Sequence, residues 1–133
     1  MTPPNIQVEI SRKQRILDIL RQMFRIQTRL EQLQWEQIAR RIAQAQGIDP
    51  DIFVAVLYCE SGMNPKAVNK NKNGTTDFGI CQFNDYWYKD IISPNVALLQ
   101  PEVALNLMAA RFKAGRANDW TCYRTGKYIS HLR

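Results

Sequence analysis

The sequence is poor in residues that bind metals and form disulfides. Among its 133 residues there is one histidine, His131, and there are three cysteines, Cys59, Cys81 and Cys122. The sequence contains no CxxC motif, so we expect no metal site, and nothing in it indicates a cofactor. Three cysteines cannot all pair within one chain. We therefore expect a fold that is stable when reduced and is made in a cytoplasm, with Cys59 and Cys81 as buried thiols.

Long apolar runs and low-complexity tracts are also missing. The hydrophobic stretches are far shorter than the roughly 20 residues of a membrane-spanning helix, so we expect no transmembrane segment. Residues 1–5 lack the basic region and apolar block of a signal peptide. A chain of 133 residues with 45% hydrophobic content is long enough for one globular domain with a modest core.

The formal charge of +6 indicates an anionic partner but does not choose one, because nucleic acid, an anionic membrane and a cell wall all qualify. Residues 1–46 contain eight Lys and Arg against four Asp and Glu, so the excess lies toward the N-terminus. No nucleic-acid recognition motif is present and the excess is modest. We therefore expect no nucleic-acid partner.

The first third of the chain predicts a long amphipathic helix. Residues 1–9 are expected to be an extended lead-in, and Ser11 is a candidate N-cap for a helix that runs to about Ala45. Apolar residues recur within it at three-and-four spacing: Ile16, Ile19, Leu20, Met23, Ile26, Leu30 and Leu33. We assign residues 1–34 to this helical extension. Three roles are open: packing on its own domain, self-association or docking to a virion or secretion apparatus, and binding to a membrane surface through its arginines.

A second helix is predicted around the apolar run 52–58. Asp49 is the expected N-cap and Pro50 the first helical residue. Gly62 and the residues after it end the helical pattern, so Glu60 should lie in the last turn.

A β-hairpin should follow, because Asn73-Gly74 is a strong hairpin-turn dipeptide. The strand that leaves this turn contains Asp77. Glu60 at a helix end and Asp77 on a hairpin can therefore face each other across a groove, and two opposed carboxylates are the groups that cleave a glycosidic bond.

Residues 59–88 resemble the active-site region of c-type lysozymes. The spacing between Glu60 and Asp77 agrees with that family, although the cysteines do not lie at its cysteine positions. Residues 60–67 also resemble the first motif of soluble lytic transglycosylases, a related fold. The residues that match the c-type pattern are Glu60-Ser61, Asn64, Asn69, Asn71, Gly74, Thr76-Asp77-Phe78-Gly79-Ile80, Gln82, Asn84 and Trp87-Tyr88.

The resemblance implies an α+β, mainly α, lysozyme-like fold over residues 35–133, with a helical lobe and a small β-hairpin sheet. It implies hydrolysis of the β-1,4 bond between N-acetylmuramic acid and N-acetylglucosamine in peptidoglycan. Glu60 would be the general acid and base, and Asp77 the nucleophile or charge stabiliser. The implied substrate-binding residues are Asn69, Asn71, Gln82, Asn84, Trp87, Trp120 and Tyr123.

Each of these residues also has a structural interpretation. Asp77, Asn69 and Asn71 are ordinary hairpin residues, and Trp87, Trp120 and Tyr123 could be core residues. Two other functions stay open: a lytic transglycosylase that uses Glu60 alone and leaves 1,6-anhydro-muramyl ends, and a non-catalytic saccharide-binding or structural module. An enzyme of this kind without a signal peptide would reach the wall through a holin, in a virion or by a secretion machine.

Overall fold

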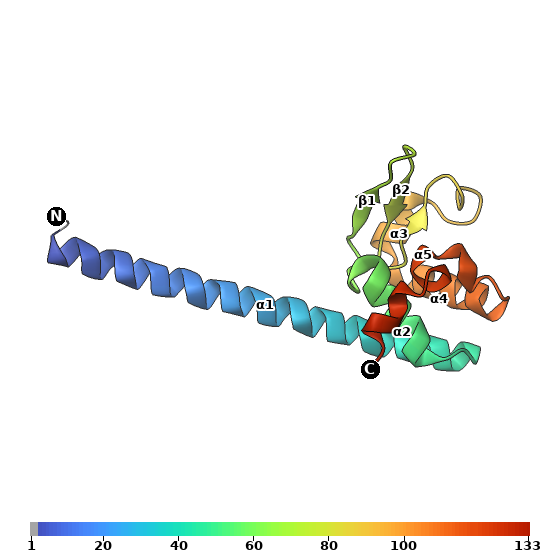
Figure 1. Cartoon of the computed structure of the whole chain (residues 1–133), viewed down its shortest axis with the longest axis horizontal. Coiled ribbons are helices and arrows are strands. Elements are labelled where there is room, and N and C mark those ends of the chain that lie inside the picture. Colours follow the sequence, from blue (N-terminus) through green and yellow to red (C-terminus); the bar gives the residue numbers. More distant parts are fainter. Residues whose placement is uncertain (1–2) are drawn as a thin grey trace. The chain divides into compact units, whose positions relative to one another are not determined.

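A computed structural model describes residues 3–133 and divides the chain into two compact units, with the boundary between residues 33 and 34. The helix α1 (Pro4–Gln46), which is blue to cyan in Figure 1, supplies all the regular structure of the first unit and the beginning of the second.

The start of α1 differs from the expected extended lead-in. Residues 1 and 2 of that lead-in lie outside the described residues, and over residues 4–9 the prediction is wrong, because α1 begins at Pro4. Proline has a backbone angle suited to the first helical position, and the Pro3 carbonyl accepts hydrogen bonds from the N–H groups of Ile6 and Gln7. Ser11 therefore lies inside the helix and does not cap it.

The helix α2 (Pro50–Ser61) begins and ends as predicted. The Asp49 side chain accepts hydrogen bonds from the N–H groups of Asp51 (2.8 Å) and Ile52 (3.3 Å), and Pro50 occupies the first turn. Gly62 ends the helix in the left-handed conformation, with φ of 65°. Five consecutive buried residues, 53–57, make α2 the central helix of the second unit.

A three-stranded antiparallel sheet follows α2. Its strands are β1 (Val68–Lys70), β2 (Thr76–Phe78) and β3 (Phe83–Asn84), in the order β1-β2-β3. Asp77 on the central strand lies opposite Asn69 on one side and Asn84 on the other. The predicted turn at Asn73-Gly74 joins β1 to β2. Figure 1 shows this hairpin beside the helices of the second unit.

The rest of the chain is short helices. They are α3 (Pro94–Leu99), α4 (Pro101–Lys113), the 3-10 helix η1 (Ala117–Asp119), α5 (Thr121–Arg124) and the 3-10 helix η2 (Lys127–His131). Gly79, just after β2, allows α3 to approach the sheet closely. A Cβ atom at Gly79 would overlap the Ala97 carbonyl oxygen, so no other residue fits there without displacing backbone. The largest fully buried side chains are Phe53, Phe83, Leu57, Met63, Ile80, Leu105, Met108, Val56 and Cys81.

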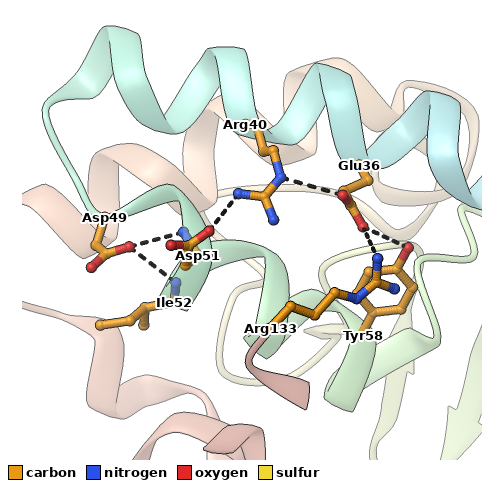
Figure 2. Close-up of polar contacts among 7 residues, drawn as sticks. All are labelled: Glu36, Arg40, Asp49, Asp51, Ile52, Tyr58 and Arg133. Carbon is orange, nitrogen blue, oxygen red and sulfur yellow. Dashed lines mark hydrogen bonds and ion pairs between the residues drawn. The ribbon is translucent and has the colours of Figure 1, made fainter.

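Polar contacts join the C-terminal part of α1 to α2, as Figure 2 shows. The Glu36 carboxylate accepts hydrogen bonds from Tyr58 Oη (2.9 Å) and Arg40 Nε (3.3 Å), and it also pairs with Arg133. Arg40 extends this chain of contacts to Asp51 at 2.7 Å. Glu36 is largely buried in this network, so the carboxylate is stabilised by several donors rather than left unpaired.

The predictions of a fold without disulfides and of Cys59 as a buried thiol are wrong, because Cys59 and Cys122 form a disulfide, with Cα atoms 6.1 Å apart. Cys59 is on the last turn of α2 and Cys122 is on α5, 63 positions later. Their proximity depends on how α5 packs against α2, which the sequence does not reveal. Cys81 is buried and free, as predicted.

The predicted fold class, α+β and mainly α with a small sheet and a long N-terminal helix, is confirmed. Within residues 3–133, no helix is long and apolar enough to cross a membrane.

Candidate functional site

Glu60 is positioned by the end of α2 and by α5. The backbone N–H of Cys122 donates a hydrogen bond of 3.0 Å to Glu60 Oε1. The neighbouring residue, Ser61, fixes the end of α2 against the chain that leaves the sheet, because its hydroxyl donates to the Ile80 carbonyl at 2.7 Å. The carboxyl of Glu60 is thus held from two sides, by α5 directly and by the Ser61 contact through the backbone.

The surroundings of Glu60 favour its neutral form. Burial raises the pKa of the Glu60 carboxyl above its ordinary value. The N–H of Cys122 lowers this pKa in part, the negative charge of Asp77 raises it, and the positive charge of Arg124 lowers it. Because burial prevails, Glu60 keeps a proton at a higher pH than an exposed glutamate does, and a protonated carboxyl can act as an acid.

Asp77 is held by a side chain on the neighbouring strand. Asn84 Nδ2 donates to Asp77 Oδ1 at 2.9 Å and lies 2.8 Å from Thr75 Oγ1. The amide oxygen of Asn84 accepts the backbone N–H groups of Tyr86 (3.0 Å) and Trp87 (3.1 Å), which fixes the amide orientation. The hydrogen bond from Asn84 therefore fixes the orientation of the Asp77 carboxylate on the central strand.

Asn69 and Gln82 pair with each other rather than with a carboxylate. Asn69 Nδ2 donates to Gln82 Oε1 at 2.8 Å. Gln82 Nε2 donates to the carbonyls of Gly79 (2.9 Å) and Ala67 (3.2 Å). Gln82 is buried and has φ of 54°, so its side chain satisfies a tight turn at the base of the sheet. The Asn69 contact therefore stabilises the hairpin.

Glu60 and Asp77 line the same cleft, which has a volume of about 720 Å³. Seven predicted site residues line it: Glu60, Asn71, Asp77, Gln82, Asn84, Trp87 and Trp120. Two predicted residues are not part of this lining. Asn69 is occupied by Gln82, and Tyr123 stacks on Tyr128 with ring centroids 5.3 Å apart.

The two predicted tryptophans have different surroundings. Trp120 is 3% exposed, donates its indole N–H to the Cys81 carbonyl at 2.8 Å and contacts the ring of Phe83. It is a core residue that also forms part of the cleft wall. Trp87 is 72% exposed and meets Tyr86 edge to face. Its ring is accessible, as a ring that stacks on a sugar must be.

Sequence reasoning missed a polar cluster on another wall of the cleft. Tyr88 Oη donates to Asp119 Oδ2 at 2.8 Å, and Arg111 and Arg116 pair with the same carboxylate at 3.2 and 3.4 Å. Burial raises the pKa of Tyr88, and its hydrogen bond to Asp119 raises it further. Burial also raises the pKa of Asp119, but the bonds from Tyr88 and Arg111 and the charge of Arg116 lower it more. Tyr88 therefore stays a donor and Asp119 stays charged.

Two further cationic side chains, Arg124 and Lys72, line the cleft, and sequence reasoning did not identify Arg124. Arg124 donates to the Asn118 carbonyl at 2.8 Å, and Lys72 lies in the hairpin loop. Arg124 directly follows the predicted residue Tyr123, but nothing in the sequence places it near Glu60. Within residues 3–133, no group of three or more His, Cys, Asp or Glu side chains could hold a metal ion.

Comparison with known proteins identifies the family of this chain. Residues 40–125 match a family model described as a lysozyme-like domain. Because the match covers well over half of the chain, the chain belongs to this lysozyme-like family. The resemblance inferred from residues 59–88 is thereby confirmed.

Individual relatives match shorter segments. Lysozyme C from Scophthalmus maximus is 34% identical over 62 residues, which cover 45% of this chain and 43% of that protein. Lysozyme C-1 from Anas platyrhynchos is 52% identical over 38 residues, or 29% of this chain and 26% of that protein. Protein IpgF from Shigella flexneri is 38% identical over 55 residues, or 41% and 34%. The matched segments thus span less than half the length of these relatives.

Proposed function

We propose that this protein is a lysozyme that hydrolyses the β-1,4 bond between N-acetylmuramic acid and N-acetylglucosamine in peptidoglycan. Glu60 is the general acid that protonates the leaving oxygen, and it then acts as the base that activates water. Asp77 is the nucleophile or the carboxylate that stabilises positive charge on the sugar. The observation that supports this proposal best is that the two carboxylates share a cleft in which burial favours protonated Glu60.

The two carboxylates have the different surroundings that these roles require. Glu60 has one backbone donor and is partly buried, and burial raises the pKa of its carboxyl, so its proton is retained to a higher pH. Asp77 accepts a hydrogen bond from the amide of Asn84, which holds its carboxylate in place on the sheet. Glycoside cleavage uses two carboxyl groups in different environments, one as the acid and one as the nucleophile or charge stabiliser. Lysozyme is the type case from which these two roles are taken.

Substrate contacts are proposed for the accessible side chains of the cleft. Trp87 would stack on a sugar face, and Asn71 would present its amide to the acetamido and hydroxyl groups. Asn84, whose amide is engaged by Asp77, Thr75 and the backbone, would act by positioning Asp77. Trp120 would act by shaping the wall beside Glu60. We assign Asn69, Gln82 and Tyr123 supporting roles, because they contact other side chains and backbone groups of the protein itself.

A lytic transglycosylase is the second candidate, and the motif that starts at Glu60 favours it. In residues 60–67, which resemble lytic transglycosylases, Ser61 accepts the Asn64 N–H at 3.3 Å and donates to Leu57 and Ile80. The motif thus builds the support for Glu60 and does not involve Asp77. Glu60 is therefore the only carboxylate that the reaction needs, provided that a hydroxyl or acetamido group of the substrate attacks the sugar in place of water.

We place the action of this enzyme at the cell wall, outside a reducing cytoplasm. The Cys59–Cys122 disulfide fits an oxidising compartment. Delivery by a holin, a virion or a secretion machine remains our proposal for the route.

Mass spectrometry of peptidoglycan digested in ¹⁸O-labelled water tests the reaction type. A lysozyme gives fragments that end in a reducing N-acetylmuramic acid and contain one ¹⁸O atom from water. A transglycosylase gives anhydro-muramyl ends that are lighter by one water and contain no label. Absence of any soluble fragment would exclude both reactions and leave a saccharide-binding or structural module.

A further inference from the structure

The part of α1 that lies in the first unit exposes an unusual amount of apolar side chain. Every one of eleven large hydrophobic residues between positions 6 and 30 is 43–71% exposed. Contiguous apolar patches beyond a few hundred Å² are rare on monomers and mark interaction surfaces. The eleven are Ile6, Val8, Ile10, Ile16, Leu17, Ile19, Leu20, Met23, Phe24, Ile26 and Leu30.

Six apolar residues of this segment form an uninterrupted heptad seam. Their spacings alternate between three and four, which is the a and d pattern of a coiled coil. We call this the first seam: Ile16, Ile19, Met23, Ile26, Leu30 and Leu33. In this register Ile16, Met23 and Leu30 take the a positions, and Ile19, Ile26 and Leu33 take the d positions. Two of the three d positions are isoleucine, and isoleucine at d with isoleucine or leucine at a favours trimers and tetramers over dimers.

A second seam runs beside the first. It consists of Ile6, Ile10, Leu17, Leu20 and Phe24, which follow the same heptad spacing with Lys13 at the missing position. A two-stranded coiled coil buries one narrow seam on each helix. Phe24 is 71% exposed and belongs to the second seam, so a single partner on the first seam would leave it in water. A helix with two adjacent seams needs two neighbours.

We propose that residues 4–33 associate with the same segment of other copies of this chain to form a bundle of three or more helices. The polar side of the helix suits the outside of such a bundle. Arg21, Arg25 and Arg29 lie there, and Asp18 pairs with Arg21 at 3.3 Å. Eleven apolar side chains are each about half exposed, so each helix has on the order of 1,000 Å² of apolar surface that association could bury. A standard protein–protein interface buries ~800 Å² per partner.

An anionic membrane fits this surface less well. A helix that lies in a lipid interface needs one continuous apolar face along its length. Here the first seam spans residues 16–33 and the second spans 6–24, so the apolar surface shifts along the helix. Lys13 and Glu31 fall on the line of the second seam, and Glu31 would be repelled by anionic lipid. In a bundle, the aliphatic part of Lys13 can cover the seam edge while its amine pairs with Glu9, 3.7 Å away.

Two double variants of the full chain separate these alternatives. Ile19→Gln with Ile26→Gln removes two d positions of the first seam. Arg21→Gln with Arg25→Gln makes the same number of changes on the polar side. Glutamine is a good helix former, so both variants keep the helical propensity of α1. Far-UV circular dichroism checks that each variant is folded.

Sedimentation equilibrium is the measurement. We expect the wild type and the arginine variant to sediment with three or more times the 15.5 kDa monomer mass, and the isoleucine variant to sediment as a monomer. A monomeric or dimeric wild type overturns the proposal, as does an isoleucine variant that is folded and still assembled. Flotation with vesicles containing phosphatidylglycerol is the second arm. Binding by a monomeric wild type that is lost in the arginine variant would assign the helix to the membrane instead.

Discussion

Reduction of the Cys59–Cys122 disulfide should strongly destabilise the second unit. The bond joins residues 63 positions apart. In the chain-entropy treatment, a crosslink that closes a loop of this length stabilises the folded state by about 4 kcal/mol. A domain of this size is stable by only about 5–15 kcal/mol, so the bond is a large part of the total.

Urea unfolding with and without a reductant measures the effect. With a slope of about 1–3 kcal/mol per molar urea, we expect the midpoint to fall by roughly 1.5–4 M on reduction. The Cys59→Ser, Cys122→Ser double variant should unfold at the lower midpoint and be insensitive to reductant. Cys81→Ala is the matched control, because Cys81 is free and the response to reductant should be unchanged.

The reasoning is refuted if a thiol assay counts three free thiols after reduction and the midpoint does not move. Such a result would mean that packing of α5 on α2 alone restrains the chain. A second readout concerns the site. Cys122 also donates its N–H to Glu60, so hydrolysis by the reduced but folded protein should decrease as α5 becomes less constrained.

Three further variants test individual parts of the account. Arg124→Gln removes a positive charge that lowers the pKa of Glu60, so the alkaline limb of the pH–activity profile should move to higher pH; an unchanged limb contradicts this coupling. Gly79→Ala should lower the free energy of unfolding by more than about 2 kcal/mol, because its Cβ would overlap the Ala97 carbonyl and the backbone φ at this position is +81°. An unfolding midpoint in urea equal to that of the wild type would instead show that α3 can move away from the sheet. Trp87→Ala should raise KM for peptidoglycan roughly 2- to 10-fold without changing the midpoint of unfolding, since its ring is exposed.

Local chemistry in the sequence was enough to predict the elements that hold the carboxylates. Asp49, Pro50 and Gly62 set the ends of α2, and Asn73-Gly74 set the hairpin, because caps and turns depend on neighbouring residues only. The start of α1 was missed because Ser11 offers a side-chain cap before the apolar pattern, whereas Pro4 begins the helix without needing such a cap.

Contacts between distant elements could not be predicted in this way. The Cys59–Cys122 bond and the Cys122 N–H at Glu60 both depend on the packing of α5 against α2. The pairing of Tyr88 with Asp119 joins residues 31 positions apart, and no local pattern in the sequence indicates it. Asn69 was predicted either to bind substrate or to be an ordinary hairpin residue, and only the folded structure pairs it with Gln82, 13 positions later.

Glu60→Gln compared with wild type is the most direct test of the central claim. Glutamine keeps the shape of the side chain and an oxygen for the Cys122 N–H, but its amide has no acidic proton to transfer to the leaving oxygen. We expect release of soluble peptidoglycan fragments to fall by at least about 100-fold. Because the pKa of Glu60 is raised, the wild type loses stability as pH rises through that pKa, so the variant should be at least as stable at pH 7 and above. A folded Glu60→Gln protein that releases fragments at the wild-type rate would contradict the account.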